Sequence, residues 1–204
     1  MTLPPFSLLW LIDRLRRFGP ANEAVAVVEF ALVVPIMLTL YIGSIELSQA
    51  FNMDQRVITI AGAVGDLVSR SNATTSPITT TSLQNNFQAA QAIIYPFDPN
   101  NQLQQVVSVV AVNAAGTTAT VEWSQGYHGG VALTQCTPYA GTHPIPAAML
   151  NISKSNWIVV SEASFVYPPM LGLFFPNSFY LYHQNFYLPR YAVYIPYNGA
   201  PAPC

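Results

Sequence analysis

Charged residues are scarce in this sequence, and their scarcity excludes several classes of protein. Only 8% of the 204 residues are Asp, Glu, Lys or Arg, whereas about 25% is typical of soluble domains. With 7 Lys and Arg residues and a net charge of −2, no basic surface is available to neutralise several phosphates, so the composition argues against nucleic-acid binding. A disordered acidic or basic chain is excluded as well, because 51% of the residues are hydrophobic and 12% are aromatic.

Cysteine is almost absent. Cys136 and Cys204 are too few for a structural zinc site or a disulfide-dense miniprotein. The chain also lacks Gly-x-Ser-x-Gly, a phosphate loop and His-Glu-x-x-His, and its histidines share no metal-ligand spacing. We therefore expect a protein that is not an enzyme and that has neither a cofactor nor a metal.

What the chain does have is a long hydrophobic run near its N-terminus. Residues 24–45 include a single charged side chain, Glu29, and a helix of that length spans about 30 Å, enough to cross the hydrocarbon core of a bilayer. A buried core helix would normally show a polar face, and a cleaved signal peptide would have a shorter apolar region of about 7–15 residues. A transmembrane helix is the preferred interpretation.

Basic residues precede this run. Arg14, Arg16 and Arg17 lie in residues 1–23, which are expected to form a cytoplasmic basic leader. An excess of positive charge before a membrane helix places the N-terminus in the cytoplasm and the following residues outside. The protein is therefore expected to be single-pass, with its C-terminal domain in the periplasm or outside the cell.

The helical pattern continues beyond the membrane. Apolar residues at three- and four-residue spacing predict an amphipathic continuation over residues 46–70. A Ser/Thr-rich linker is expected at residues 71–82, followed by an extracytoplasmic domain at residues 83–204.

This domain is expected to contain one short helix and about four strands. The helix is predicted at Leu83–Ile94, where apolar residues align and Pro96 ends the pattern. Strands, rich in β-branched or aromatic residues, are predicted at residues 104–113, 118–125, 156–167 and 179–195, the last with a break near Pro189. Because the strands follow one another through turns and loops, the sheet should be mainly antiparallel and the fold class α+β.

Motifs in the hydrophobic run and its continuation carry a family resemblance. Glu29-Phe30 is followed by Ala-Leu-Val-Val-Pro35, and Gly43-Ser-Ile is followed by Glu46-Leu. The segment resembles the TadE/TadG family of bacterial tight-adherence pilus proteins. In that family the apolar N-terminal helix opens with small residues and Glu-Phe, and continues with Ala-Leu-Val-x-Pro and Gly-x-x-Glu-Leu.

The resemblance implies a pilin-like fold and a minor pilin or pseudopilin of a Tad-type pilus assembly apparatus at the bacterial inner membrane. Helix packing and domain docking would carry its function. Its partners would be other pilin or pseudopilin subunits, the inner-membrane assembly platform and, where the leader is cleaved, a prepilin peptidase.

The resemblance also implies roles for particular residues. In the family the fifth residue after the peptidase cut is Glu, which places the cut between Ala24 and Val25; Ala24 stands where the family has Gly. Cleavage would give Val25 an α-ammonium that Glu29 of a neighbouring subunit could neutralise. The alternative for Glu29 is a carboxylate that reaches the cytoplasmic headgroups from the helix end. Phe30, Pro35 and Glu46 complete the expected assembly residues.

Cys136 and Cys204 lie outside the membrane in this topology, where a disulfide can persist. A bond between them would close a loop of about 70 residues and contribute up to about 4 kcal/mol in the chain-entropy model. Two unpaired thiols are the alternative.

Aromatic residues are concentrated between Phe165 and Tyr197. Alternation along a strand would put some of them in the core and others on a surface that binds a partner. The alternative function is therefore a permanently anchored bitopic envelope adapter, which binds a partner or a surface ligand through an aromatic sheet face.

Overall fold

A computed structural model describes residues 22–72, 75, 77–95, 102–169, 172, 176–191, 195–198 and 204; the side chains of residues 22–24 are outside this description. Its elements, in chain order, are α2 (Asn22–Ser69), α3 (Thr80–Gln91), the 3-10 helix η1 (Ala92–Ile94), β1 (Leu103–Val112), β2 (Ala119–Tyr127), α4 (Ala147–Ile152), β3 (Trp157–Tyr167) and β4 (Phe179–Tyr187). The chain divides into two compact units, Met1–Ser48 and Gln49–Cys204, and α2 contributes to both. The predicted basic leader lies almost entirely outside the described residues.

In the first unit, α2 is helical through Pro35. Proline removes one backbone donor, and membrane helices tolerate it where other groups satisfy the freed carbonyls. The carbonyl freed by Pro35 is that of Ala31, four residues earlier. The Thr39 hydroxyl donates a hydrogen bond of 2.7 Å to the carbonyl oxygen of Pro35 itself.

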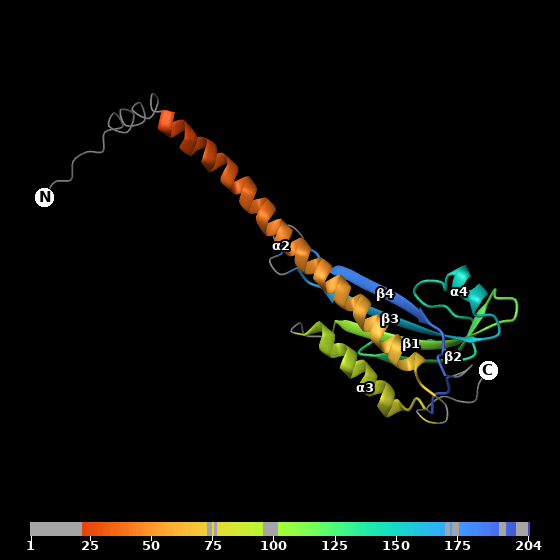
Figure 1. Cartoon of the computed structure of the whole chain (residues 1–204). Helices are drawn as coiled ribbons and strands as arrows, with labels where there is room; N and C mark the ends of the chain where they lie inside the picture. Colours follow the sequence, from red (N-terminus) through yellow and green to blue (C-terminus); the bar gives the residue numbers. More distant parts are fainter. Residues whose placement is uncertain are drawn as a thin grey trace. The chain divides into compact units, whose positions relative to one another are not determined.

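The second unit is built on one sheet of four strands in the order β2-β1-β3-β4, and every neighbouring pair is antiparallel (Figure 1). The central pair aligns Leu103 with Phe165 at one end and Ala111 with Trp157 at the other. The predicted α+β class, with a long N-terminal helix, a short helix and an antiparallel sheet, is confirmed.

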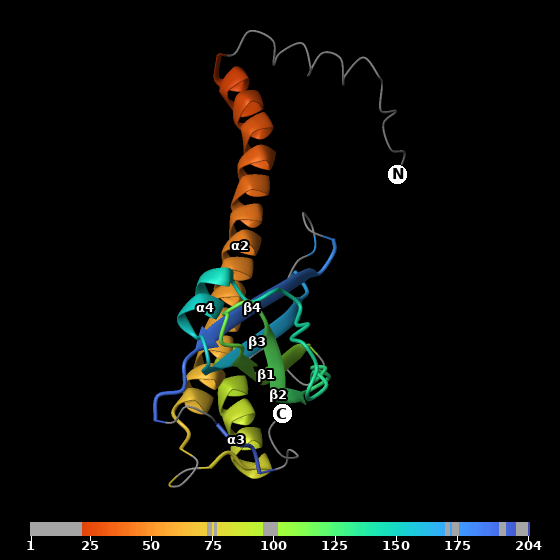
Figure 2. The same cartoon turned by 90° about the vertical axis from the view of Figure 1, so that its right-hand side faces the viewer.

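One face of the sheet is covered by α3 and by the part of α2 that follows Ser48 (Figures 1 and 2). The apolar residues of α2 recur at three- and four-residue spacing and therefore form one buried stripe. The buried residues of α2 in this core are Met53, Val57, Ile60, Ala61, Val64 and Val68. They pack with buried residues of α3 and of the sheet, including Phe87, Val107 and Phe165.

Helix α3 begins inside the Ser/Thr-rich segment that was predicted as a linker up to residue 82. Thr79 is its N-cap: the Thr79 hydroxyl accepts from the Ser82 amide, and the Ser82 hydroxyl accepts from the Thr79 amide. Such reciprocal bonds satisfy two backbone donors that a helix start leaves free. The hydroxyls that predicted a linker therefore act as a helix cap.

The opposite face of the sheet is partly covered by α4, which was not predicted, and by the chain between β2 and α4. A second, smaller core lies there, formed by Val110, Val112, Ala119, Val121, Ile145, Ile158 and Val160. Met149 and Leu150 of α4 pack against it.

Strand β4 ends at Tyr187, just before Pro189, where a break in the predicted strand was expected. A proline cannot donate to the ladder and commonly ends pairing. Side chains of β4 lie on both faces of the sheet. Leu181 and Tyr187 pack on the helix-covered core, whereas Phe186 packs on the smaller core of the other face.

Candidate functional site

The first unit presents an extended apolar surface. An 18-residue stretch of α2 near the N-terminus is apolar enough to cross a membrane, and 0% of it is buried. The large apolar side chains that are at least 37% exposed on this part of the helix are Val25, Val27, Val28, Phe30, Leu32, Val33, Ile36, Met37, Leu38, Leu40, Tyr41, Ile45 and Leu47. Contiguous apolar surface of this extent is typical of a membrane or protein interface, so this helix suggests a membrane anchor.

The predicted processing and assembly residues lie along this surface. The backbone of Ala24 is helical, and Val25 is 56% exposed. Glu29 is exposed one helical turn after Val25, so the two positions share a face of α2. Phe30, next to it, is 70% exposed.

Glu46 differs from Glu29. It is 3% exposed, and neither of its carboxylate oxygens has a hydrogen-bond partner among the described residues. A rise of 1.5 Å per residue separates Glu29 and Glu46 by about 25 Å along the helix. The structure therefore does not bring the predicted assembly residues together into one site; they mark positions along one helix.

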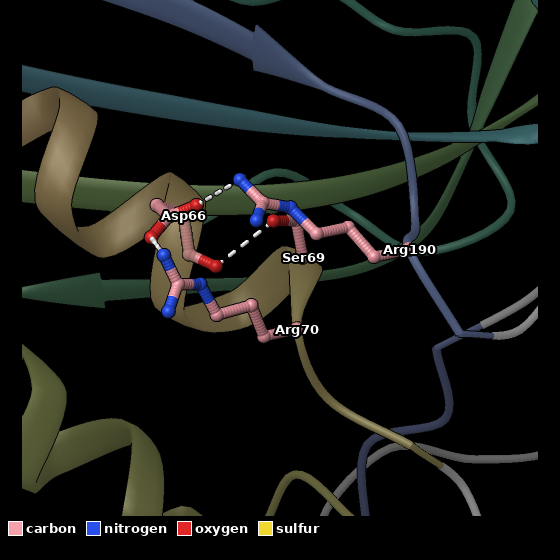
Figure 3. Close-up of polar contacts among 4 residues, drawn as sticks. All are labelled: Asp66, Ser69, Arg70 and Arg190. Atoms are coloured by element: carbon pink, nitrogen blue, oxygen red, sulfur yellow. Dashed lines mark hydrogen bonds and ion pairs between the residues drawn. The ribbon is translucent and has the colours of Figure 1, made fainter.

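The last turn of α2 carries an ion-pair cluster in the second unit (Figure 3). The Asp66 carboxylate contacts Arg70, the residue that follows α2, and Arg190 from the segment after β4, each at 2.5 Å. The Ser69 hydroxyl donates to the Asp66 carbonyl oxygen, and the Arg190 amide donates to the Ser69 carbonyl oxygen at 2.9 Å. These ion pairs and hydrogen bonds connect the chain after β4 to the end of α2.

Small residues in α2 allow β4 to approach closely. A Cβ at Gly65 would lie 2.5 Å from Tyr187 Cε2, a distance that real Cβ atoms do not adopt. Gly65 therefore has a packing role, because the absence of a side chain makes room for the Tyr187 ring.

Two further contacts join α2 to β4 and were not predicted from the sequence. His183 Nε2 lies 2.6 Å from Asp54 Oδ1, and Asn185 Nδ2 donates to the Ile58 carbonyl oxygen at 3.4 Å. Alternation along β4 was the one signal that could have placed His183 and Asn185 on the same face.

The opposite sheet face carries a buried carboxylate. Glu162 is 9% exposed, and its Oε1 accepts a hydrogen bond of 2.6 Å from the Tyr139 hydroxyl. Gln184 Nε2 donates to the same Tyr139 oxygen at 2.7 Å. Burial, and next the hydrogen bond to Glu162, raise the pKa of Tyr139, which therefore stays protonated and donates at neutral pH.

Cys136 and Cys204 form a disulfide with a Cα–Cα distance of 5.5 Å, as predicted. The Cys136 amide donates to the Val121 carbonyl oxygen and the Val121 amide donates to Thr137, so the bonded segment also covers the outer edge of β2. Covering an edge strand blocks unwanted pairing with another chain.

The described part of the chain contains no group of three or more His, Cys, Asp or Glu residues that could hold a metal ion. The histidines have other contacts: His128 stacks on Tyr127, and His143 packs on Tyr182.

Comparison with known proteins places part of α2 in relation to a family. Residues 24–64 match the family described as TadE-like protein. No curated protein matches, and no solved structure matches. The family association suggests contact with pilus components and with a membrane. The resemblance drawn from the Glu-Phe, Pro and Gly-x-x-Glu-Leu motifs is thus confirmed: residues 24–64 are similar to the TadE-like family, which indicates involvement in Tad pilus assembly.

Proposed function

We propose that this protein is a minor pilin or pseudopilin-like component of a bacterial Tad-type pilus assembly apparatus. It acts without catalysis, through packing of α2 with the helices of other subunits and through docking of its second unit. Residues 24–45 anchor it in the inner membrane, with the N-terminus in the cytoplasm and the second unit outside.

The observation that carries the proposal is the TadE-like match over a helix whose apolar side chains are exposed. A family match alone would leave the mechanism open, and exposed apolar surface alone would fit any anchor. Together they favour a helix that exchanges lipid contacts for contacts with other subunits. The folded second unit supplies the part that remains in water.

Glu29 supplies the specific step. A carboxylate near the centre of a membrane helix costs about 2.5–3.5 kcal/mol on insertion scales, and less toward the interface. Cleavage after Ala24 would remove the basic leader and create an α-ammonium at Val25. The Glu29 carboxylate of a neighbouring subunit then pairs with that ammonium, and assembly relieves the cost of the charge.

The mass of the membrane-bound protein tests processing. When the full chain is expressed with the matching prepilin peptidase, we expect a mature chain that starts at Val25. Retention of Met1 under these conditions contradicts the pseudopilin proposal and favours the permanently anchored adapter.

Glu29→Gln tests the pairing step. The variant should insert in the membrane as well as the native chain or better, because a neutral amide is less costly in hydrocarbon than a carboxylate. Its recovery with the assembled pilus fraction should fall. The matched control is the double variant Glu29→Gln/Val33→Glu, which restores the charge one turn farther along α2; it should not restore recovery. Normal recovery of Glu29→Gln would show that Glu29 serves only the peptidase or the headgroup region.

A further inference from the structure

The sheet face opposite α2 and α3 carries an open pocket beside Glu162. Its floor is formed by β1, β3 and β4, through residues that include Gln104, Glu162, Ser164 and Tyr182. Val131 and Thr142, from the chain between β2 and α4, line it as well. We call this the Glu162 pocket; all its lining residues belong to the second unit.

Close packing shapes this pocket. A Cβ at Gly141 would lie 2.7 Å from Glu162 Oε1, and a Cβ at Gly130 would lie 2.9 Å from Val106 Cγ2. Only glycine lets the backbone approach the sheet so closely at these two positions. The connection between β2 and α4 is thereby held against the sheet, and the walls of the pocket are fixed.

Glu162 lacks a cationic partner among the described residues. The Glu162 carboxylate accepts a hydrogen bond from the Tyr139 hydroxyl, which is neutral. The described arginines are engaged elsewhere: Arg56 donates to the Ile93 and Tyr95 carbonyl oxygens, and Arg70 and Arg190 contact Asp66. A buried carboxylate is normally paired with a cation or a metal.

The hydroxyl of Tyr182 lies next to Glu162. The Tyr182 hydroxyl is buried and makes no hydrogen bond of ordinary geometry in the described part of the chain, although Thr142 and Glu162 lie near enough to affect its pKa. Burial, and next the charge of Glu162, raise the pKa of Tyr182, so this hydroxyl is neutral. Its oxygen can accept a hydrogen bond from a donor group. The pocket therefore offers a carboxylate and a phenol oxygen to one donor group.

The rim of the pocket is apolar. Val131 is 82% exposed and Tyr180 is 63% exposed, and both line the pocket. Val166, which pairs with Tyr180 across the ladder between β3 and β4, is 41% exposed. Exposed apolar and tyrosine side chains around a polar centre are typical of a protein-binding surface.

We propose that the Glu162 pocket binds the ammonium or guanidinium group of a Lys or Arg side chain on a partner protein. The cation pairs with the Glu162 carboxylate, donates to the Tyr182 hydroxyl and lies near the Tyr180 ring, while the aliphatic part of its side chain packs on Val131. The inference goes beyond the proposed function, because it rests only on the second unit and holds whether or not the leader is cleaved.

The test is an NMR titration of the full chain in detergent micelles. The probe is Nα-acetyl-lysine N-methylamide, and its neutral counterpart is Nα-acetyl-norleucine N-methylamide, which has a similar aliphatic chain. We expect saturable shifts of the pocket amides with the lysine probe and at least fivefold weaker binding of the norleucine probe. Equal binding of the two probes, or no saturable shift with lysine, would overturn the proposal.

Variants assign the effect to Glu162. Glu162→Gln keeps an acceptor for Tyr139 but removes the charge, and it should weaken lysine binding about tenfold. The matched control is Glu122→Gln: Glu122 is 6% exposed on β2, and its carboxylate accepts from the Cys204 amide rather than lining the pocket. This control should bind as the native chain does.

Tyr180→Ser keeps the proposal testable if Glu162→Gln fails to fold. Tyr180 is largely exposed, so its removal should leave the fold intact and weaken lysine binding several-fold. A folded Glu162→Gln or Tyr180→Ser variant with native affinity would contradict the proposal.

Discussion

The two parts of helix α2 differ in what surrounds their apolar side chains. Before the unit boundary, Leu32 is 68% exposed and Ile36 is 62% exposed. After it, Val57 and Ile60 are both 0% exposed, because they face the sheet. One helix thus carries two kinds of apolar surface, one already covered by its own chain and one that is not.

This difference assigns a separate role to each part. Burial of apolar area drives folding at about 25 cal/mol per Å², so the second unit is stabilised by the residues that α2 contributes to its core. The first part gains nothing of this kind from its own chain. A bilayer or the helices of other subunits must cover it, which agrees with its TadE-like sequence.

The largest effect is expected from cutting the chain at the boundary between the two units. A fragment of residues 49–204 retains the α2 residues of the core and should fold as a soluble protein when it is made in an oxidising compartment. The full chain should sediment with membranes, and the fragment should stay in the supernatant. A fragment that aggregates or sediments with membranes would contradict the assignment.

Two isoleucines allow the same substitution to be compared in the two parts of α2. Ile60→Ala should lower the free energy of unfolding of the second unit by about 2–5 kcal/mol, because it leaves a cavity in a closed core. Ile36→Ala should change it by less than about 0.5 kcal/mol, because that side chain is outside this core. Denaturant unfolding of both variants in the same detergent measures the difference; similar effects would refute it.

Loss of the disulfide should affect only the second unit. Cys204→Ser should lower its free energy of unfolding by about 2–4 kcal/mol, because the bond closes a long loop in the unfolded chain. Thermal unfolding with and without reductant provides the measurement. If reductant does not destabilise the native protein, the bond makes no contribution.

The Asp66 cluster should give the smallest effect. Asp66→Asn removes its ion pairs with Arg70 and Arg190, whose side chains are 55% and 50% exposed. Exposed pairs contribute roughly 0–1 kcal/mol and are screened by salt. We expect a loss of at most about 1 kcal/mol at low salt and less at high salt, measured by denaturant unfolding. A loss that is larger and independent of salt would mean that Asp66 has another role.

The features that could be predicted from the sequence are those with a local signal. The hydrophobic run, the three- and four-residue spacing after it and the β-branched strands each appear in consecutive residues. The α+β fold follows from them, and the pairing of Cys136 with Cys204 follows from the topology and the absence of other cysteines.

Contacts between distant residues could not be predicted in this way. Asp54 and His183 are 129 positions apart, and Asp66 and Arg190 are 124 positions apart. Their pairing depends on how β4 packs on α2, which no short pattern encodes. No sequence pattern indicated that Glu162 is buried either, because the connection between β2 and α4 covers its carboxylate.

Membrane topology tests the central claim most directly. Reporter enzymes fused after Ser71, one active only in the cytoplasm and one active only outside it, assign a side to the residues that follow the apolar part of α2. We expect activity of the external reporter alone, because the arginines of the leader hold the N-terminus in the cytoplasm. Activity of the cytoplasmic reporter would contradict the orientation, the compartment of the disulfide and the proposed docking outside the membrane.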